Sequence, residues 1–212
     1  MLKKKNIRNL SIEELSLFFK KHGIAKFRSK QVYEWLWKKK ACNFDEMTSL
    51  SISDRELLKN YFSINALTIH KSEKSSDGTI KYSLKLFDNK LVEGVLIPSR
   101  KRLTACVSSQ AGCSLSCTFC ATGTLKLERN LDFGEIYDQV FILNEEAKQN
   151  FGRPLSNIVY MGMGEPLLNY DNLIKSINLI SSKDGLSMSP KRITVSTAGI
   201  AKMIKKLADD EV

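Results

Sequence analysis

The chain has 212 residues, of which 42% are hydrophobic, and its formal net charge is +10. This length and hydrophobic content allow a buried core in one or two domains. No stretch approaches the roughly 18 apolar residues that a membrane-spanning helix needs. No apolar segment with a cleavage site follows the basic residues Lys3–Lys5, so there is no sign of a secretory signal. We therefore expect a cytoplasmic protein with no membrane partner.

The positive charge is concentrated near the amino terminus. Residues 1–40 contain twelve Lys or Arg and three Glu, so they carry +9 of the net charge of +10. A basic segment beside a nearly neutral remainder is typical of a module that binds a polyanion. Charge alone favours nucleic-acid binding over the alternative, a solvated lysine-rich surface.

Residues 1–64 predict a small helical domain. Capping boxes begin at Ser11 and Ser53, and each precedes apolar residues at helical spacing. A further helix is expected over residues 29–40. The apolar residues expected to face the core of the first two helices are Leu15, Phe18, Phe19, Val32, Trp35 and Leu36.

Residues 65–98 predict a β-hairpin that bridges two larger units. Apolar and polar residues alternate from Ile80 to Leu86, as they do in a half-buried strand. Asp88-Asn89 then signals a turn. On the second strand one face is shared by Leu91, Glu93, Val95 and Ile97.

Residues 99–212 repeat the order strand, loop, helix three times. The strands are expected at 103–108, 157–161 and 192–196, and the helices at 133–148, 171–181 and 200–207. Repeated βα units predict a parallel sheet with helices on its face. Binding sites in such sheets lie at the carboxyl ends of the strands, where a cysteine loop and the loop Gly162-Met163-Gly164-Glu165-Pro166 both fall.

Four of the five cysteines lie between residues 106 and 120, which indicates metal binding or catalysis and not a disulfide framework. Cys113, Cys117 and Cys120 have the spacing C-x3-C-x2-C. Structural zinc sites need four ligands, and no His lies between residues 71 and 212, so zinc would require Cys106 as well.

The three-cysteine spacing favours a [4Fe–4S] cluster. Such a cluster normally takes four Cys, so three thiolates leave one iron open. The amino and carboxylate groups of S-adenosylmethionine (SAM) can bind that iron, and electron transfer then releases a 5′-deoxyadenosyl radical. Zinc and redox-active or spare thiols remain as alternatives.

Several segments, namely Cys106 to Cys120, Met161 to Asn169 and Arg192 to Gly199, resemble the RlmN/Cfr-type dual-specificity RNA methyltransferases of the radical SAM superfamily. This resemblance implies an α/β fold: an incomplete radical SAM partial (βα)6 barrel with about three βα units, preceded by a small helical domain and a β-hairpin. It assigns RNA binding to residues 1–64, a hairpin linker to 65–98 and the radical SAM core to 99–212.

The resemblance also implies roles for individual residues. It assigns the [4Fe–4S] cluster to Cys113, Cys117 and Cys120, and contacts with SAM to Gly164, Glu165 and Ser196.

Two further residues match catalytic positions of the family. Glu93 matches a general base that removes a proton from the target adenine. A carboxylate that shares a face with apolar residues would be partly desolvated, which raises its pKa; the alternative is an exposed edge-strand Glu. Cys106 matches a cysteine that resolves a protein–RNA intermediate by forming a disulfide, although a lone Cys at a strand start is usually core. Cys42 matches no functional position.

The implied reaction is methylation of adenine C2 in 23S rRNA, at the peptidyl transferase centre, and in tRNA. One SAM methylates a late cysteine and a second generates the radical, with electrons from an external donor such as flavodoxin. The expected protein is a monomer. The segment Glu165-Pro166-Leu167 resembles the C2 branch more than the C8 (Cfr) branch.

The sequence departs from the family pattern at its carboxyl end. The family barrel has about six βα units, and no cysteine follows Cys120 here. We therefore expect a fragment or truncated product that does not methylate RNA alone. The alternatives are a C8 methyltransferase, another radical SAM activity such as an activase, and a non-catalytic RNA-binding module stabilised by a metal.

Overall fold

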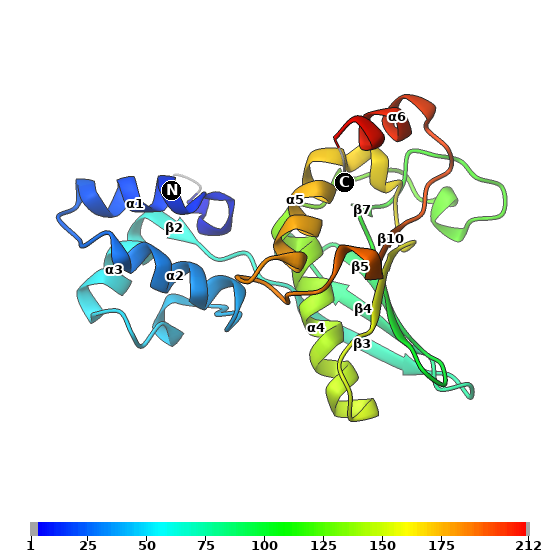
Figure 1. Cartoon of the computed structure of the whole chain (residues 1–212), viewed down its shortest axis with the longest axis horizontal. Helices are drawn as coiled ribbons and strands as arrows, with labels where there is room; N and C mark the ends of the chain where they lie inside the picture. The colour runs from blue at the N-terminus through cyan, green and yellow to red at the C-terminus, as the bar shows by residue number, and fades with distance from the viewer. Residues whose placement is uncertain (1–3, 211–212) are drawn as a thin grey trace. The chain divides into compact units, whose positions relative to one another are not determined.

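The computed structural model describes residues 4–210, which fold as two compact units. Unit 1 contains the chain up to Ala66 together with Ser182–Ser187, and unit 2 contains Leu67–Ser181 and the chain from Met188 (Figure 1). Within the described residues, no helix combines the length and the apolar character that crossing a membrane requires.

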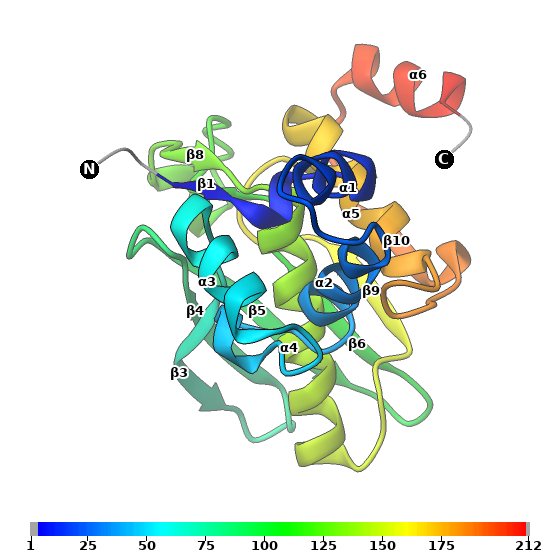
Figure 2. The ribbon, with the colours of Figure 1, turned by 90° about the vertical axis from the view of Figure 1, so that its left-hand side faces the viewer.

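Unit 1 is built on three helices, which Figure 2 shows together. They are α1 (Ile12–Lys21), α2 (Phe27–Trp37) and α3 (Ile52–Tyr61), with the short 3-10 helices η1 (Ile7–Asn9) and η2 (Phe44–Glu46) and a parallel pair of two-residue strands, β1 (Lys5–Asn6) and β2 (Phe62–Ser63). The capping box at Ser11 is confirmed, because its hydroxyl accepts from Glu14 N and the Glu14 carboxylate accepts from Ser11 N. The core contains Leu15, Phe19, Val32, Leu36, Trp37 and Leu58.

Two details predicted for unit 1 are wrong. The cap of α3 is Ser51, whose hydroxyl accepts from Asp54 N, while Ser53 already lies inside the helix. On α2 the buried tryptophan is Trp37, which is fully buried, and not Trp35. The Trp35 ring is only partly buried, because its Nε1 donates to the Ser49 hydroxyl at the surface.

Unit 2 contains one six-stranded mixed sheet. Its strands lie in the order β10 (Ile193–Val195), β9 (Asn157–Tyr160), β6 (Leu103–Val107), β5 (Leu91–Pro98), β4 (Ile80–Lys85) and β3 (Thr68–Lys74). β6, β9 and β10 are parallel and are followed by α4 (Phe133–Phe151), α5 (Tyr170–Ser181) and α6 (Ala201–Asp209). The three predicted βα units are therefore confirmed.

The predicted hairpin forms from β4 and β5, which pair antiparallel. β5 also pairs with β6, so the hairpin continues the sheet of the βα units. β3, which the sequence did not reveal, adds an exposed strand at the edge beside β4. The remaining short elements of unit 2 are β7 (Gln110–Ala111), β8 (Arg129–Asn130), η3 (Ala121–Thr124), η4 (Pro166–Asn169) and η5 (Pro190–Arg192).

The two faces of the sheet differ in burial. α4 packs against β5 and β6, and α5 packs against α4 (Figure 1). Val92 and Leu96 of β5 are fully buried on the covered face, where Gly94 leaves room for Leu143 of α4. Leu91, Glu93 and Ile97 lie on the other face and are exposed. The alternation predicted for β5 is thus present, but the residues grouped with Glu93 belong to the open face.

Candidate functional site

The loops that follow β6 and β9 are held together by their backbones. The amides of Ser109 and Gln110 both donate to the carbonyl oxygen of Met163, at 2.9 and 3.2 Å. The Ser108 hydroxyl accepts from Met163 N at 2.8 Å and donates to the Glu93 carbonyl at 2.6 Å. These bonds fix the start of the cysteine loop beside the Gly-Met-Gly-Glu-Pro loop, at the carboxyl ends of two neighbouring parallel strands.

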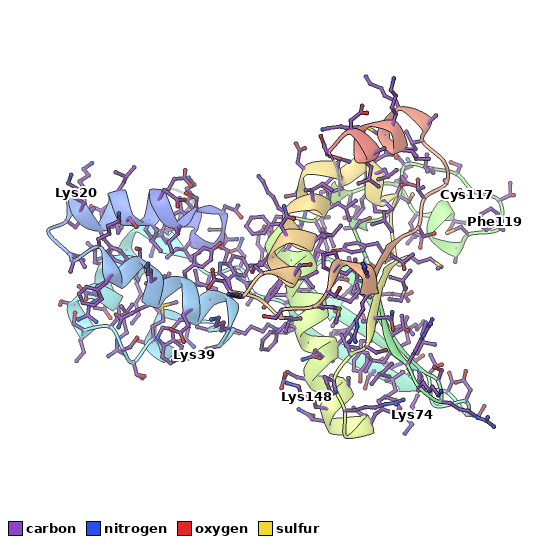
Figure 3. All side chains as sticks on the ribbon, in the orientation of Figure 1. Lys20, Lys39, Lys74, Cys117, Phe119 and Lys148 are labelled. Atoms are coloured by element: carbon purple, nitrogen blue, oxygen red, sulfur yellow. The ribbon has the colours of Figure 1, made fainter. Side chains whose placement is uncertain are left out.

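A cavity of about 190 Å³ lies where these loops meet the loop after β10. Six of the eight residues singled out from the sequence line it: Cys113, Cys117, Cys120, Gly164, Glu165 and Ser196. Figure 3 shows Cys117 and Phe119 on the outer part of the cysteine loop, where the Phe119 ring is 91% exposed. The parallel topology therefore brings together residues that lie up to 83 positions apart in the sequence.

Glu165 ties the loops around the cavity to one another. Its carboxylate is buried and accepts from Leu167 N at 3.0 Å and from Ala198 N, in the loop after β10, at 2.8 Å. Its own amide donates to the Gln110 side-chain oxygen at 2.9 Å. Both carboxylate oxygens thus accept hydrogen bonds from backbone amides. Glu165 therefore positions the loop after β10, which begins at Ser196.

Gly164 allows the close approach of two loops. Its φ is +92°, and an added Cβ atom would lie 2.4 Å from the Cβ atom of Gln110. Gln110 is fully buried, and its side-chain nitrogen Nε2 donates a 2.7 Å hydrogen bond to the Asn130 side chain. A side chain at position 164 would therefore displace the residue that anchors Glu165.

The three thiols of the cysteine loop are a donor set that fits an iron–sulfur cluster. No disulfide, at Cys106 or elsewhere, forms among the described residues. In residues 4–210 no three His, Cys, Asp or Glu side chains converge closely enough to hold one metal ion. An iron–sulfur cluster presents separate irons to separate thiolates. Cys113, Cys117 and Cys120 line one cavity, and their thiols are the donors that such a cluster takes.

Glu93 and Cys106 lie apart from this cavity, on the open face of the sheet. In register, Cys106 on β6 pairs with Val95 on β5 and with Val159 on β9. Burial raises the pKa of the Cys106 thiol, and the nearby Glu93 carboxylate adds to that increase. The Glu93 side chain is 51% exposed and pairs with Lys81 Nζ at 3.2 Å. The expected desolvation of Glu93 by its apolar neighbours is therefore wrong, because Leu91 and Ile97 are exposed too and Val95 is only partly buried.

Two buried polar residues of the site were not recognised from the sequence. One is Gln110, described above. The other is Asn169, whose side-chain amide donates to the carbonyl oxygens of Ser109 and Leu131 at 2.8 and 2.7 Å. Both lie inside motifs that were recognised. In the sequence each is only a polar residue next to an apolar strand or turn. That pattern is too common to identify Gln110 and Asn169 as buried residues of the site.

Two family models match the chain. Residues 5–64 match the ribosomal RNA large subunit methyltransferase N-terminal domain, and residues 107–211 match the radical SAM superfamily. The chain is 58% identical over 211 residues to the probable dual-specificity RNA methyltransferase RlmN of Cytophaga hutchinsonii, with 100% of this chain and 58% of that protein covered. It is 48% identical over 198 residues to the dual-specificity RNA methyltransferase RlmN of Oleidesulfovibrio alaskensis, with 92% and 55% covered.

A solved structure agrees with these matches. The crystal structure of a radical SAM methyltransferase from Sphaerobacter thermophilus superposes with a TM-score of 0.84 at 36% sequence identity, covering 96% of this chain and 60% of that chain. Proteins of this superfamily use a [4Fe–4S] cluster and SAM. The chain spans less than two thirds of the length of each of these relatives. From its fold, its cysteine loop and these matches, the chain belongs to the RlmN/Cfr-type RNA methyltransferase family of the radical SAM superfamily.

Proposed function

We propose that this chain provides the RNA-binding domain and the cluster- and SAM-binding part of an enzyme that methylates adenine C2 in 23S rRNA and in tRNA. The observation that carries the proposal is the single cavity lined by three cysteines, the Gly-Met-Gly-Glu-Pro loop and Ser196. We further propose a cytoplasmic, monomeric protein that receives electrons from an external donor such as flavodoxin.

In this proposal Cys113, Cys117 and Cys120 hold the [4Fe–4S] cluster. Held there, the cluster would supply the electron that cleaves SAM. The chain's own residues bind and orient SAM. Gly164 leaves backbone accessible at the cavity wall, and Ser196 lies at the cavity end of β10 with its amide bonded to the Tyr160 carbonyl at 3.2 Å.

Glu93 and Cys106 are proposed to act on RNA from the open face of the sheet. The half-exposed Glu93 carboxylate is accessible to a nucleobase, as a general base must be. Cys106 is partly buried on the same face, and its raised pKa keeps its thiol protonated and unreactive until a partner approaches. The family's methyl-carrying cysteine has no counterpart after Cys120 in these 212 residues.

Unit 1 offers a surface suited to RNA. A groove of about 840 Å³ runs between α1 and the start of α2, and the Leu17 and Phe27 side chains in it are 66% and 57% exposed. Lys20, Lys26 and Lys30 line the same groove. An exposed ring can stack on an unpaired base while ammonium groups neutralise phosphates. Figure 3 shows Lys20 at the surface of α1.

Anaerobic reconstitution of the 212-residue chain with iron and sulfide tests the cluster. We expect iron and sulfide to bind, and 5′-deoxyadenosine to form from SAM when a reductant is added. Cys117→Ala should abolish both, whereas Cys42→Ala is the matched control because this thiol is exposed in unit 1. Tight zinc binding without SAM cleavage would support the non-catalytic module.

RNA binding and the position of methylation are tested separately. Phe27→Ala should weaken binding of tRNA, and Lys26→Glu should weaken it and also reduce its salt dependence. Phe87→Ala is the matched control, since Phe87 is an exposed aromatic of unit 2. Nucleoside analysis of RNA from cells with and without the gene then distinguishes 2-methyladenosine from the C8 product. Unchanged RNA binding in both unit 1 variants would contradict this role.

A further inference from the structure

The cysteine loop, residues 112–128, leaves and rejoins the body of unit 2 at one place. Its base is the short antiparallel pair of β7 and β8, in which Ala111 faces Arg129. Glu128 N donates to the Ala111 carbonyl at 2.9 Å. Gly112 has φ +78°, and an added Cβ atom would lie 2.0 Å from the Lys126 carbonyl oxygen, so the two ends of the loop are in direct contact.

Arg129, the first residue after the loop, makes paired hydrogen bonds with two carboxylates. Its Nε and Nη2 donate to the two carboxylate oxygens of Asp88 at 2.7 and 3.1 Å. Its Nη1 and Nη2 donate to the two oxygens of Glu135 at 2.7 and 2.8 Å. Paired, two-pronged contacts of this kind fix the direction of a guanidinium as well as its position.

These contacts join three separate elements. Asp88 lies in the turn between β4 and β5, and Glu135 is a fully buried residue in the first turn of α4. A second ion pair, Lys90 to Glu128, also links that turn to the end of the loop. The Arg129 guanidinium carbon lies 5.2 Å from the centre of the Phe87 ring. The β4–β5 turn, far from the cysteines in sequence, therefore braces the exit of the cysteine loop.

We propose that Arg129, through Asp88 and Glu135, is a positioning residue that holds the cysteine loop in the arrangement needed to retain its cluster. The part of this inference that concerns the cluster rests on the proposed function. The part that concerns loop geometry does not. Arg129 does not line the cavity, so it acts through the loop and not on the reacting groups.

If the Arg129 ion pairs were merely structural, they would stabilise unit 2 as a whole. Their loss would then make the loop no more mobile than the rest of unit 2. The two roles therefore differ in where the effect of a substitution appears. Within the loop, Cys120 N donates to the Cys117 carbonyl and Gly123 N to the Cys120 carbonyl, at 3.1 and 2.9 Å. The hydrogen exchange of these two amides reports directly on the arrangement of the cysteines.

The test compares Arg129→Met, Arg129→Lys and Asp88→Asn in the full 212-residue chain. Tyr82→Phe is the matched control, because it removes one partly buried hydrogen bond, from Tyr82 to Glu146, elsewhere in unit 2. Asp88→Asn keeps the Arg129–Glu135 pair, so it remains informative if Arg129→Met does not fold. Arg129→Lys keeps the charge but not the paired geometry.

In the chain without iron, we expect the Cys120 and Gly123 amides to exchange at least about tenfold faster in the three variants than in the native chain, and unchanged exchange in Tyr82→Phe. Unchanged exchange in all three variants overturns the inference. After reconstitution, a chelator should remove iron faster from the variants than from the control. Iron loss at the native rate, despite faster exchange, would overturn the link to the cluster. Failure of the native chain to take up iron would overturn the proposed function and that link, and the exchange data would still decide the loop geometry.

Discussion

Gly164→Ala is expected to destabilise unit 2 by more than a left-handed backbone alone would explain. Gly164 has φ +92°, and an alanine Cβ would lie 2.4 Å from Cβ, 2.7 Å from Cγ and 2.8 Å from Oε1 of Gln110. Gln110 has little freedom to move, because its side chain is bonded to Glu165 N and to Asn130. The substitution therefore costs both backbone strain and at least one buried hydrogen bond.

The magnitude follows from a comparison with Gly152→Ala. Gly152 ends α4 at φ +66°, and no atom would lie within 4 Å of an added Cβ. Left-handed backbone costs an alanine about 1–2 kcal/mol, and a buried amide left without an acceptor costs about 1–3 kcal/mol. We expect about 1–2 kcal/mol for Gly152→Ala and about 2–5 kcal/mol for Gly164→Ala. The reduced entropy of the unfolded chain is common to both variants and cancels in the difference.

Urea unfolding followed by far-UV circular dichroism measures these values. With a urea dependence of about 1–3 kcal/mol per molar, the two midpoints should differ by roughly 1 M. Both tryptophans, Trp35 and Trp37, lie in unit 1, so tryptophan fluorescence provides an internal control for that unit. Equal destabilisation by the two substitutions would refute the argument that Gly164 is required by contact with Gln110.

Three further predictions concern caps, pH and thiols. Ser11→Ala should destabilise unit 1 by about 1 kcal/mol, since it removes a helix cap, and an unchanged tryptophan unfolding transition would contradict this. The hydrogen bond from Arg129 lowers the pKa of Asp88, so its stabilisation is present above about pH 4 and is lost as pH falls through the lowered pKa. Urea midpoints of Asp88→Asn and the native chain should therefore differ at pH 7 and converge in acid; an equal difference at both pH values would exclude this linkage. In alkylation followed by mass spectrometry at pH 7, the exposed Cys42 should react before Cys106, whose pKa is raised by burial; the reverse order would show that Cys106 is activated.

Local sequence pattern was sufficient for most elements of unit 2. The apolar runs and helical periodicities predicted β6, β9, β10 and the three helices that follow them to within a few residues at each end. β3 escaped prediction because all seven of its residues are exposed, so it has no buried face to produce an alternating pattern. The cap of α3 was misplaced for a related reason. Ser51 and Ser53 are both serines at the start of the helical pattern, and only the backbone geometry shows that Ser51 is the cap.

Period-two alternation in β5 correctly grouped Leu91, Glu93, Val95 and Ile97, but it did not reveal which face is covered. That depended on α4, whose side chains fill the space above Val92, Gly94 and Leu96. A strand with apolar residues on both faces is consistent with either orientation. The exposure of Glu93 is therefore decided by the packing of α4, a helix about 50 residues away in the sequence.

The candidate site divides in the same way. The sequence alone determined the cysteine spacing, the glycine-rich loop and the positions of both after strands, because these are local patterns. Only the tertiary structure decided that Glu165 reaches Ala198, that Gln110 fills the space beside Gly164, and that Arg129 joins Asp88 to Glu135. Each of these contacts joins residues that are distant along the chain or belong to different elements. Such contacts depend on strand order and helix packing, which no local pattern of residues encodes.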